Sequence, residues 1–404
     1  MIDLHIFEFP LSLILALALV LCISLSCKYL KGRNPVSRPV SLILLLLSSA
    51  LLAVEGTWCF GIYHHWTFIT VIVIVLMALG LASVNDFTHK SISAFLSHSG
   101  LFLVLLGGLF GAPDSTNAFM KVYTGGCDEH IAFDASGYAV PLPFSVSLED
   151  FNIDCYEDGT SPKQYTSALS IDGRITQTSV NHPCRHKGYR IYQSGYDLDS
   201  GHYSVLKIVR DPWLPVVALG ALMLLLGALL SLKTAWSNWK VLVVVLLLAV
   251  VFALISIARI SFGTLPPALR SLWFVPHLIV YMLAYSILAL SVISGFVSLI
   301  SAKVPDGLPA KLLSTASSLL LIGMMCGAVW AKQAWGDYWT WDAKECWAAA
   351  TWLLTLAGTH TPRKSLKFSF AVIAFLAMQM TWYGVNYLPS SMQSLHTYNQ
   401  EKSI

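Results

Sequence analysis

One stretch of the sequence combines residue types that could hold a flat aromatic ligand. From Trp335 to Trp347 it reads WGDYWTWDAKECW, and it contains four of the chain's 13 tryptophans together with several charged side chains. It lies between two apolar runs, where an aromatic belt at the membrane surface is the simplest explanation. Such a belt needs only one or two aromatic residues per helix end, whereas four indoles with carboxylates between them suit a flat, amphiphilic, aromatic ligand. We therefore interpret this tryptophan segment, residues 335–347, as a ligand platform.

Four histidines lie where they could bind such a ligand in pairs. His277 opens an apolar run and His396 lies in the C-terminal tail, both on the predicted face of the tryptophan segment. His98 lies about one turn inside another run and His360 ends a further one, both near the opposite face. Neutral imidazole is the common axial ligand of haem iron, but a single membrane histidine is more often an interfacial residue with its polar tip in water. Both interpretations stay open on topology alone.

The composition is typical of a polytopic membrane protein. The chain has 404 residues, of which 56% are hydrophobic and only 12% are charged. It has no basic tract, zinc-finger spacing or phosphate-binding loop, so nucleic-acid binding and nucleotide hydrolysis have no support. Eight cysteines occur, but none of them lies in C-x-x-C or C-x-x-C-H. The chain therefore has no attachment site for a c-type haem of its own.

Ten apolar runs are candidates for crossing a bilayer. They lie near residues 10–28, 41–57, 67–85, 94–111, 213–232, 241–260, 275–300, 312–333, 346–360 and 368–388, and the fourth and ninth are short. Between the fourth and fifth runs, short alternating pieces separated by turn residues predict β-strands. We therefore predict an all-α polytopic membrane protein of about ten transmembrane helices, with a small β-rich extracytoplasmic module.

The same runs divide the chain into four predicted regions. These are an N-terminal transmembrane region at 1–111, the β-rich module at 112–212, the fifth span with a cytoplasmic loop at 213–239, and a transmembrane domain at 240–404 that contains the tryptophan segment. Lysines and arginines of the short loops concentrate in one alternate set, which predicts that this set is cytoplasmic. The chain is thus expected to be a multi-pass protein of the cell's cytoplasmic membrane, with both termini and the β module outside.

The tryptophan segment resembles the WWD signature of a haem-handling family that includes the cytochrome c assembly proteins CcsA and ResC. The family pattern is approximately W-G-x-Y-W-x-W-D-x-K-E-x-W. The matching residues here are Trp335, Gly336, Tyr338, Trp339, Trp341, Asp342, Lys344, Glu345 and Trp347. Two positions differ, because Ala343 stands where proline is frequent and Cys346 where a small hydroxyl residue is common.

The flanking sequence extends this resemblance over both halves of the chain. SLWFVPHLIVYMLAY and YGVNYLPSSMQSLHTY are similar to the family segments with two external histidines, which map to His277 and His396. THTPR resembles the segment with an inner histidine, which maps to His360. SHSGLFLVLLGGLFG resembles a span of the partner family, CcsB or ResB, and gives His98 as the other inner histidine. The chain as a whole resembles a compact fusion of the two, the System II cytochrome c synthase, with a shorter soluble module than is typical.

The resemblance implies a function with haem b as the transported substrate. A System II synthase moves haem b to the outer face and attaches it by thioether bonds to the C-x-x-C-H segment of apocytochrome c, which makes it a holocytochrome c synthase. The resemblance implies that His98 and His360 bind haem iron in the membrane, and that His277 and His396 ligate it at the signature. The catalytic set would add Trp335, Trp339, Trp341 and Asp342 to the outer histidines, and Gly336, Tyr338 and Trp347 would complete the haem site. A thiol-reducing assembly protein and membrane lipid are the other implied partners.

Other functions and roles stay open. A haem exporter or chaperone would need the same histidines but no contact with C-x-x-C-H. A membrane b-type electron carrier would place paired histidines inside the bundle, whereas His277 and His396 are predicted at or beyond the surface. For the carboxylates Asp337, Asp342 and Glu345, we expect helix capping or pairing with Lys344 rather than proton donation.

Overall fold

Most of the chain forms long helices. The computed structural model describes residues 8–30, 36–197, 202–236, 265–301 and 307–390, together with a few isolated positions. Among these residues, eight helices have the length and apolar composition needed to cross a membrane. They are α1 (Leu11–Leu30), α2 (Arg38–Trp58), α3 (Trp66–Thr88), α4 (Ile92–Gly111), α5 (Leu214–Ala235), α7 (Phe274–Ile300), α8 (Leu308–Trp335) and α10 (Lys364–Trp382).

The count of candidate spans in the described residues is therefore eight, not the predicted ten. The predicted span at 241–260 lies outside the described residues, apart from three helical positions. The predicted span at 346–360 does form a helix, α9 (Ala343–His360), but it is not among the eight. Its first turn contains Lys344 and Glu345, and it ends on a histidine, so it is less apolar than its neighbours. The described residues also form three short 3-10 helices: η2 (Ile62–His64), η3 (Pro267–Leu269) and η4 (Gly384–Tyr387).

The region between α4 and α5 forms a single antiparallel sheet of eight strands, so the prediction of an all-α class applies to the membrane part only. The strands are β1 (Thr116–Tyr123), β2 (Glu129–Phe133), β3 (Ala139–Cys155), β4 (Pro162–Ile171), β5 (Arg174–Ser179), β6 (Cys184–His186), β7 (Tyr189–Tyr196) and β8 (Tyr203–Arg210). Their order in the sheet is β5-β4-β3-β2-β1-β8-β7-β6.

The sheet curls until its two ends meet. Thr178 of β5 donates a hydrogen bond of 2.8 Å to the carbonyl of Ile191 in β7, and Ser179 forms an isolated bridge with His182. Side chains on one face of each strand fill the interior, as Ala118, Met120 and Val122 of β1 do with exposures of at most 1%. This alternation follows from the two-residue period of a strand, and it gives the module a barrel-like shape with a core of its own.

Asp172, in the turn between β4 and β5, ties two hairpins of the module together. Its Oδ2 accepts hydrogen bonds from Lys187 Nζ at 2.7 Å and from the His186 ring at 2.9 Å, and its Oδ1 accepts from the Ser145 N–H at 3.0 Å. The Lys187 ammonium, with the Ser145 N–H and the His186 ring, holds the pKa of Asp172 well below its ordinary value of 3.8.

We expect Asp172→Asn to lower the thermal stability of the protein at neutral pH, since the amide keeps the shape but loses the charge. A pKa that is depressed in the folded state contributes stability above the unfolded value, and this stability is lost as the pH falls through the folded value. The difference in melting temperature between wild type and variant should therefore begin to shrink only below about pH 4, so that it is smaller at about pH 3 than at about pH 7. Asp150→Asn, at an exposed position of β3, is the control. An equal difference at both pH values would contradict this account.

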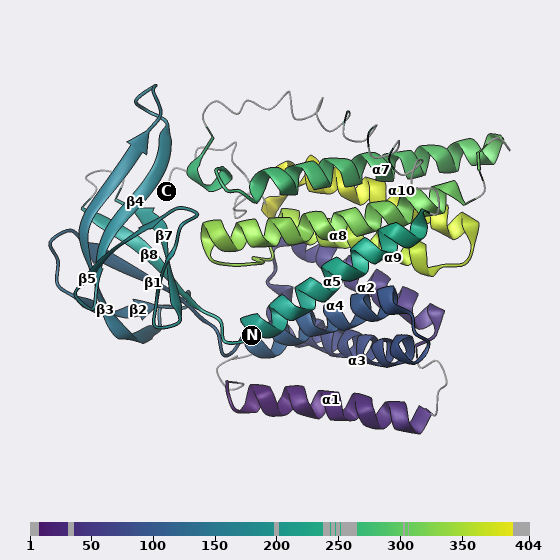
Figure 1. The fold of residues 1–404 in the computed structure, drawn as a ribbon, viewed down its shortest axis with the longest axis horizontal. Helices are drawn as coiled ribbons and strands as arrows, with labels where there is room; N and C mark the ends of the chain where they lie inside the picture. The colour runs from purple at the N-terminus through teal and green to yellow at the C-terminus, as the bar shows by residue number, and fades with distance from the viewer. Residues whose placement is uncertain are drawn as a thin grey trace.

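The β module lies at one end of the helical bundle, and α4 and α5 connect to it directly (Figure 1). These two helices pack against each other very closely. A Cβ at Gly100 would lie 2.7 Å from the carbonyl oxygen of Gly220, and a Cβ at Gly220 would lie 2.7 Å from that of Gly100. Small residues that allow such close approach are typical of helix contacts in membranes. Because α3 and α4 are joined by a short turn, the start of α4 and the end of α3 lie at the bundle end away from the module.

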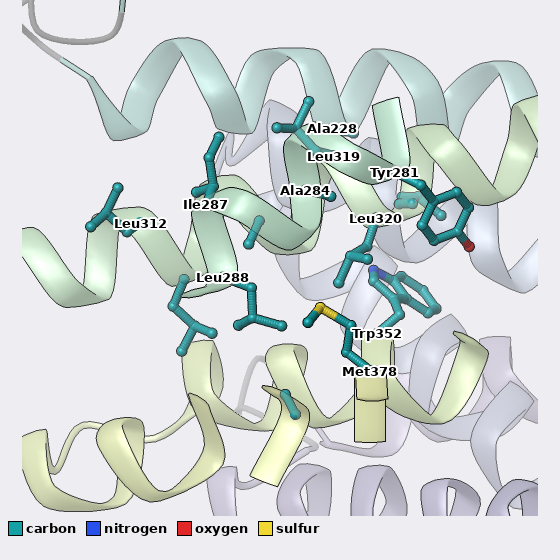
Figure 2. Close-up of a cluster of buried hydrophobic side chains, with 14 of the residues drawn as sticks. Ala228, Tyr281, Ala284, Ile287, Leu288, Leu312, Leu319, Leu320, Trp352 and Met378 are labelled. Carbon is teal, nitrogen blue, oxygen red and sulfur yellow. The ribbon is translucent and has the colours of Figure 1, made fainter. Parts of the chain in front are cut away.

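The main core of the bundle joins α5, α7, α8, α9 and α10, and two partly buried residues of α4 pack against it. Figure 2 shows this cluster, in which Tyr281 and Leu288 of α7 and Leu320 of α8 pack with Trp352 of α9 and Met378 of α10. Leu288 and Leu320 are fully or almost fully buried, with exposures of 0% and 1%. This core fixes α9 against α7, α8 and α10, and it therefore fixes both ends of α9, where the predicted site residues lie.

Candidate haem sites at the two ends of the bundle

His98 and His360, which the sequence places near the same face of the membrane, lie beside each other. His98 is in the second turn of α4 and His360 is the last residue of α9, and their ring centroids are 6.5 Å apart with an angle of 52° between the planes. Both positions are at the end of the bundle away from the β module. Two imidazoles that share one metal through bonds of about 2 Å have ring centres roughly 6 Å apart. The observed separation therefore fits a pair of axial ligands.

Hydrogen bonds at Nδ1 prepare both rings for this role. His98 Nδ1 lies 2.6 Å from Asp86 Oδ2 of α3, and His360 Nδ1 lies 2.8 Å from the carbonyl oxygen of Leu356. Since carboxylates and carbonyls only accept, each Nδ1 carries the proton and each Nε2 keeps its lone pair for a metal. The hydrogen bond of His360 is not particular to this site, since the His89 ring makes the same bond to the carbonyl of Asn85. The carboxylate partner of His98 is the more informative contact, and sequence analysis missed it.

The tryptophan segment lies at the opposite end of the bundle, next to the β module. α8 ends at Trp335, and Gly336 follows with a φ of +87°, a conformation that glycine adopts without strain. Lys332 Nζ donates a hydrogen bond of 2.8 Å to the carbonyl oxygen of Gly336. The chain then turns back and starts α9 after Asp342.

His277 lies in the first turn of α7. Its ring contacts Trp330, which in turn contacts Trp335 of the tryptophan segment. Its ring centroid lies 5.7 Å from that of Trp330, which lies 5.0 Å from that of Trp335. His277 Nδ1 lies 2.9 Å from the carbonyl oxygen of Gly323, so this ring is also fixed at Nδ1. A Cβ at Gly327 would lie 2.7 Å from the ring, so the glycine provides the space that the imidazole occupies. The predicted partner of His277, His396, lies outside the described residues.

Trp341 is the most constrained residue of the segment. Its φ is +62°, which is rare for a bulky side chain and marks stored backbone strain. Its ring stacks on Tyr63 at 5.2 Å with an angle of 9°, and it meets the edges of Phe68 at 5.2 Å and Trp339 at 6.1 Å. Tyr63 lies in η2, between α2 and α3, and Phe68 lies in the first turn of α3. Nothing in their local sequence singled them out.

The four indoles do not form one continuous stack in the ring contacts that the structure describes. Trp335 contacts Trp330 on the α7 side, whereas Trp339 and Trp341 contact each other near α3. Trp347 packs on α2, where a Cβ at Gly56 would lie 2.9 Å from its Cδ1. The Nε1 atoms of Trp339 and Trp347 are buried and have no hydrogen-bond partner within the described part of the chain. Buried donors of this kind are costly, and a ligand oxygen would satisfy them.

The carboxylates of the segment make structural contacts, of which the cap by Asp342 is among those expected from the sequence, whereas the ion pair of Asp337 is not. Asp342 Oδ1 accepts from the Glu345 N–H at 2.8 Å and so caps α9. Glu345 Oε2 accepts from the N–H of Thr340 at 2.7 Å. Asp337 forms an ion pair with Lys207 of β8, and accepts a further bond of 3.1 Å from Asn117 of β1. Asp337 thus fastens the tryptophan segment to the β module.

The fold is that of a polytopic membrane protein. Two histidines from distant parts of the chain lie side by side at one end of its helical bundle, and the tryptophan segment contacts the β module at the other end. Comparison with known families agrees with this division. Residues 89–202 match the ResB-like family, and residues 213–393 match the family described as cytochrome C assembly protein. One chain therefore matches both family models, which is consistent with a ResB–CcsA fusion.

Several curated relatives are named cytochrome c biogenesis protein CcsA. That of Chlamydomonas reinhardtii is 31% identical over 154 residues, which are 33% of this chain and 44% of the relative. That of Synechococcus sp. is 31% identical over 179 residues, which are 33% of this chain and 59% of the relative. That of Guillardia theta is 29% identical over 203 residues, which are 38% of this chain and 66% of the relative. The chain thus spans about half the length of the first two relatives.

Proposed function

We propose that this protein acts in cytochrome c biogenesis as a System II synthase. It moves haem b from the cytoplasmic side of the membrane to the outer face, where the β module and tryptophan segment lie, and attaches it to the C-x-x-C-H segment of apocytochrome c. The observation that carries this proposal is the 6.5 Å separation of the His98 and His360 rings. His98 belongs to the ResB-like region and His360 to the cytochrome c assembly region. A two-ligand iron site at this position would therefore need both regions.

Haem is the cargo of the inner pair. The Nε2 atoms of His98 and His360 would ligate its iron, because both Nδ1 atoms are already engaged. The Asp86 carboxylate, 2.6 Å from His98 Nδ1, orients the ring and makes it a more basic ligand. Bis-histidine ligation would hold haem in the membrane until it is passed outward.

At the outer face, the tryptophan segment would hold haem for the reaction. His277 and His396 are the proposed ligands there, and Trp335, Gly336, Tyr338 and Trp341 would contribute to the same site. The unpartnered Nε1 atoms of Trp339 and Trp347 could donate to oxygen atoms of the bound molecule. Fixing haem beside an acceptor peptide turns a bimolecular addition into a positioned one, which is worth several orders of magnitude in effective concentration.

The attachment itself needs no oxidant. Each acceptor thiol adds across one haem vinyl group, so that a C–S bond forms at one vinyl carbon and the thiol proton ends on the other. The two acceptor cysteines must be reduced beforehand, which is the reason for a thiol-reducing assembly partner. The acceptor's own histidine then displaces one protein ligand from iron, and this exchange would release the product.

Co-expression with an apocytochrome tests the proposal. Cells that lack their own assembly system would produce this protein and an acceptor with C-x-x-C-H, and haem would be stained on a denaturing gel. We expect covalent haem on the acceptor with the wild-type protein and none without it. Free haem outside the cell with no covalent product would favour the exporter. Stable, redox-active haem b in stoichiometric amount, again without covalent product, would favour the electron carrier.

Asp86→Asn should weaken haem binding at the inner pair about tenfold, because partners that orient a metal ligand contribute this much to affinity. The loss of a negative charge next to His98 should also raise the reduction potential of the bound haem. A titration of the purified protein with haem, followed by absorption, measures the affinity, and a spectroelectrochemical titration measures the reduction potential. Asp86→Glu, which restores the carboxylate, should recover part of the shift. An unchanged potential in Asp86→Asn would mean that this carboxylate has only a structural role.

Asp342→Asn should keep most of the covalent haem product, whereas Asp342→Ala should lower the stability by about 1 kcal/mol and reduce the product. Asparagine caps a helix as well as aspartate does, and the carboxylate accepts the Glu345 N–H as a cap. Melting temperature and the haem-stained gel check the two variants side by side. Equal loss of product in both variants, with Asp342→Asn as stable as wild type, would instead indicate proton donation by Asp342.

A further inference from the structure

A basic cavity of about 340 Å³ lies where the β module meets the helices. One wall is the β6–β7 hairpin, with Arg185 and Arg190, and another is Asp211 with the first residue of α5. Lys332, in the last turn of α8, closes the cavity from the bundle. The cavity is distinct from the pair His98 and His360, which lies at the other end of the bundle.

The charges in its walls are unfavourable without a bound anion. Arg185 and Arg190 stand directly opposite each other in the pairing of β6 with β7, and like charges in that position destabilise a sheet. Lys332 is only 6% exposed, and a buried ammonium is costly without a counter-charge. The carboxylates that act on it are Asp211 and Asp337, and Asp337 is already paired with Lys207. Two further basic side chains of the hairpin, His186 and Lys187, are already bonded to Asp172.

Asp211 is the one carboxylate among the residues that line this cavity. One of its oxygens already accepts a hydrogen bond of 3.1 Å from the Trp213 N–H. Three cations, Arg185, Arg190 and Lys332, against one carboxylate leave an excess of two positive charges. An anion with two charges would balance it.

The cavity also adjoins the tryptophan segment. Lys332 Nζ lies 4.9 Å from the ring centroid of Tyr338 and bonds to the carbonyl of Gly336. Tyr192, two residues from Arg190 and hence on the same face of β7, packs against Gly336, where a Cβ would lie 3.2 Å from its ring. The Tyr192 hydroxyl is buried and lies within hydrogen-bonding reach of the Arg190 guanidinium, which donates toward its oxygen. Its own O–H is therefore a further donor beside the cations.

We propose that this cavity binds a doubly charged oxyanion through Arg185, Arg190 and Lys332. Two sources offer two such charges at the membrane surface: the paired propionate carboxylates of haem, and the two phosphates of a dianionic lipid headgroup such as that of cardiolipin. Guanidinium groups bind both with paired, charge-assisted hydrogen bonds. The first source rests on the proposed function, because it needs haem at the tryptophan segment, whereas the second does not.

The test uses the full-length protein in three forms: wild type, the double variant Arg185→Gln with Arg190→Gln, and the control variant Arg174→Gln. Arg174 is at an exposed position of β5. Haem and haem dimethyl ester, whose propionates are blocked, are titrated into each protein. The same proteins are placed in nanodiscs of phosphatidylcholine with and without cardiolipin, and the retained lipid is counted by native mass spectrometry. Melting temperatures without haem check folding, and the double variant should be at least as stable as wild type because a like-charge pair is removed.

A propionate site predicts that the double variant binds haem about tenfold to hundredfold more weakly, as expected for lost charge-assisted bonds, while its affinity for the ester equals that of wild type. A lipid site predicts unchanged haem affinity and loss of retained cardiolipin. If haem does not bind even to wild type but cardiolipin is lost in the double variant, the proposed function fails and the oxyanion site stands. Unchanged binding of both ligands in a folded double variant would overturn the inference.

Discussion

Replacing either His98 or His360 with alanine is expected to remove most of the haem that copurifies with this protein. Each substitution takes away one of the two proposed axial ligands, whose rings are 6.5 Å apart, and a single imidazole holds haem iron far less tightly than a pair. We expect at least about a tenfold loss, since even partners of a metal ligand contribute that much. Absorption spectra of the purified variants measure haem per chain, and covalent haem on a co-expressed acceptor should fall in parallel.

The chain offers a matched control for these substitutions. His89, near the same end of the bundle, makes the same bond from Nδ1 to a carbonyl four residues earlier as His360 does, but it is exposed. His89→Ala should leave haem content unchanged. Added imidazole should restore part of the haem in His98→Ala and His360→Ala, because it can occupy the vacated ligand position. Normal haem content in either alanine variant would contradict the assignment of the inner pair.

His277→Ala is expected to abolish the covalent product while leaving haem at the inner pair. His277 contacts Trp330 and, through it, Trp335, so its loss should affect only the outer site. The inner histidines lie at the other end of the bundle and should still bind their cargo. The variant would therefore accumulate haem that cannot be attached, which a combination of absorption spectra and haem-stained gels detects.

His130→Ala, at an exposed position of β2, is the control for His277→Ala and should behave as wild type. Loss of both covalent product and bound haem in His277→Ala would mean that the two ends are not independent sites. Full covalent product would remove His277 from the reaction. The amount of haem bound to the protein and the amount attached to the acceptor thus report on haem transport and on covalent attachment separately.

The sequence predicts the helices of this protein well because long apolar runs have few alternatives. It predicts α9 less well, because Lys344, Glu345 and several small or polar residues lower the hydropathy of this helix. One side of α9 nevertheless packs into the main core. The strands of the β module follow from alternation, but their order does not. Strand order depends on pairings between distant segments such as β1 with β8, which no local pattern encodes.

The site shows the same limit. The motif identifies His98 and His360 one at a time, and only the packing of α4 and α9 in three dimensions brings the rings together. Asp86 was missed because a carboxylate at the end of a helix has many explanations before its partner is known. Trp330 and Tyr63 were missed because aromatic residues in or beside apolar helices are usually packing residues. Trp330 did carry a signal, since it lies five residues before the tryptophan segment on the same helix.

The most direct test of the central claim is to determine which residues ligate haem iron at the inner end of the bundle. The protein would be purified with haem in the His277→Ala background, which removes the outer site, and ferric haem would be examined by electron paramagnetic resonance. We predict the low-spin spectrum of an iron with two imidazole ligands, which is lost when His98 or His360 is also replaced with alanine. A high-spin spectrum, or a low-spin spectrum that persists in those variants, would contradict the claim that the two halves of this chain share one haem.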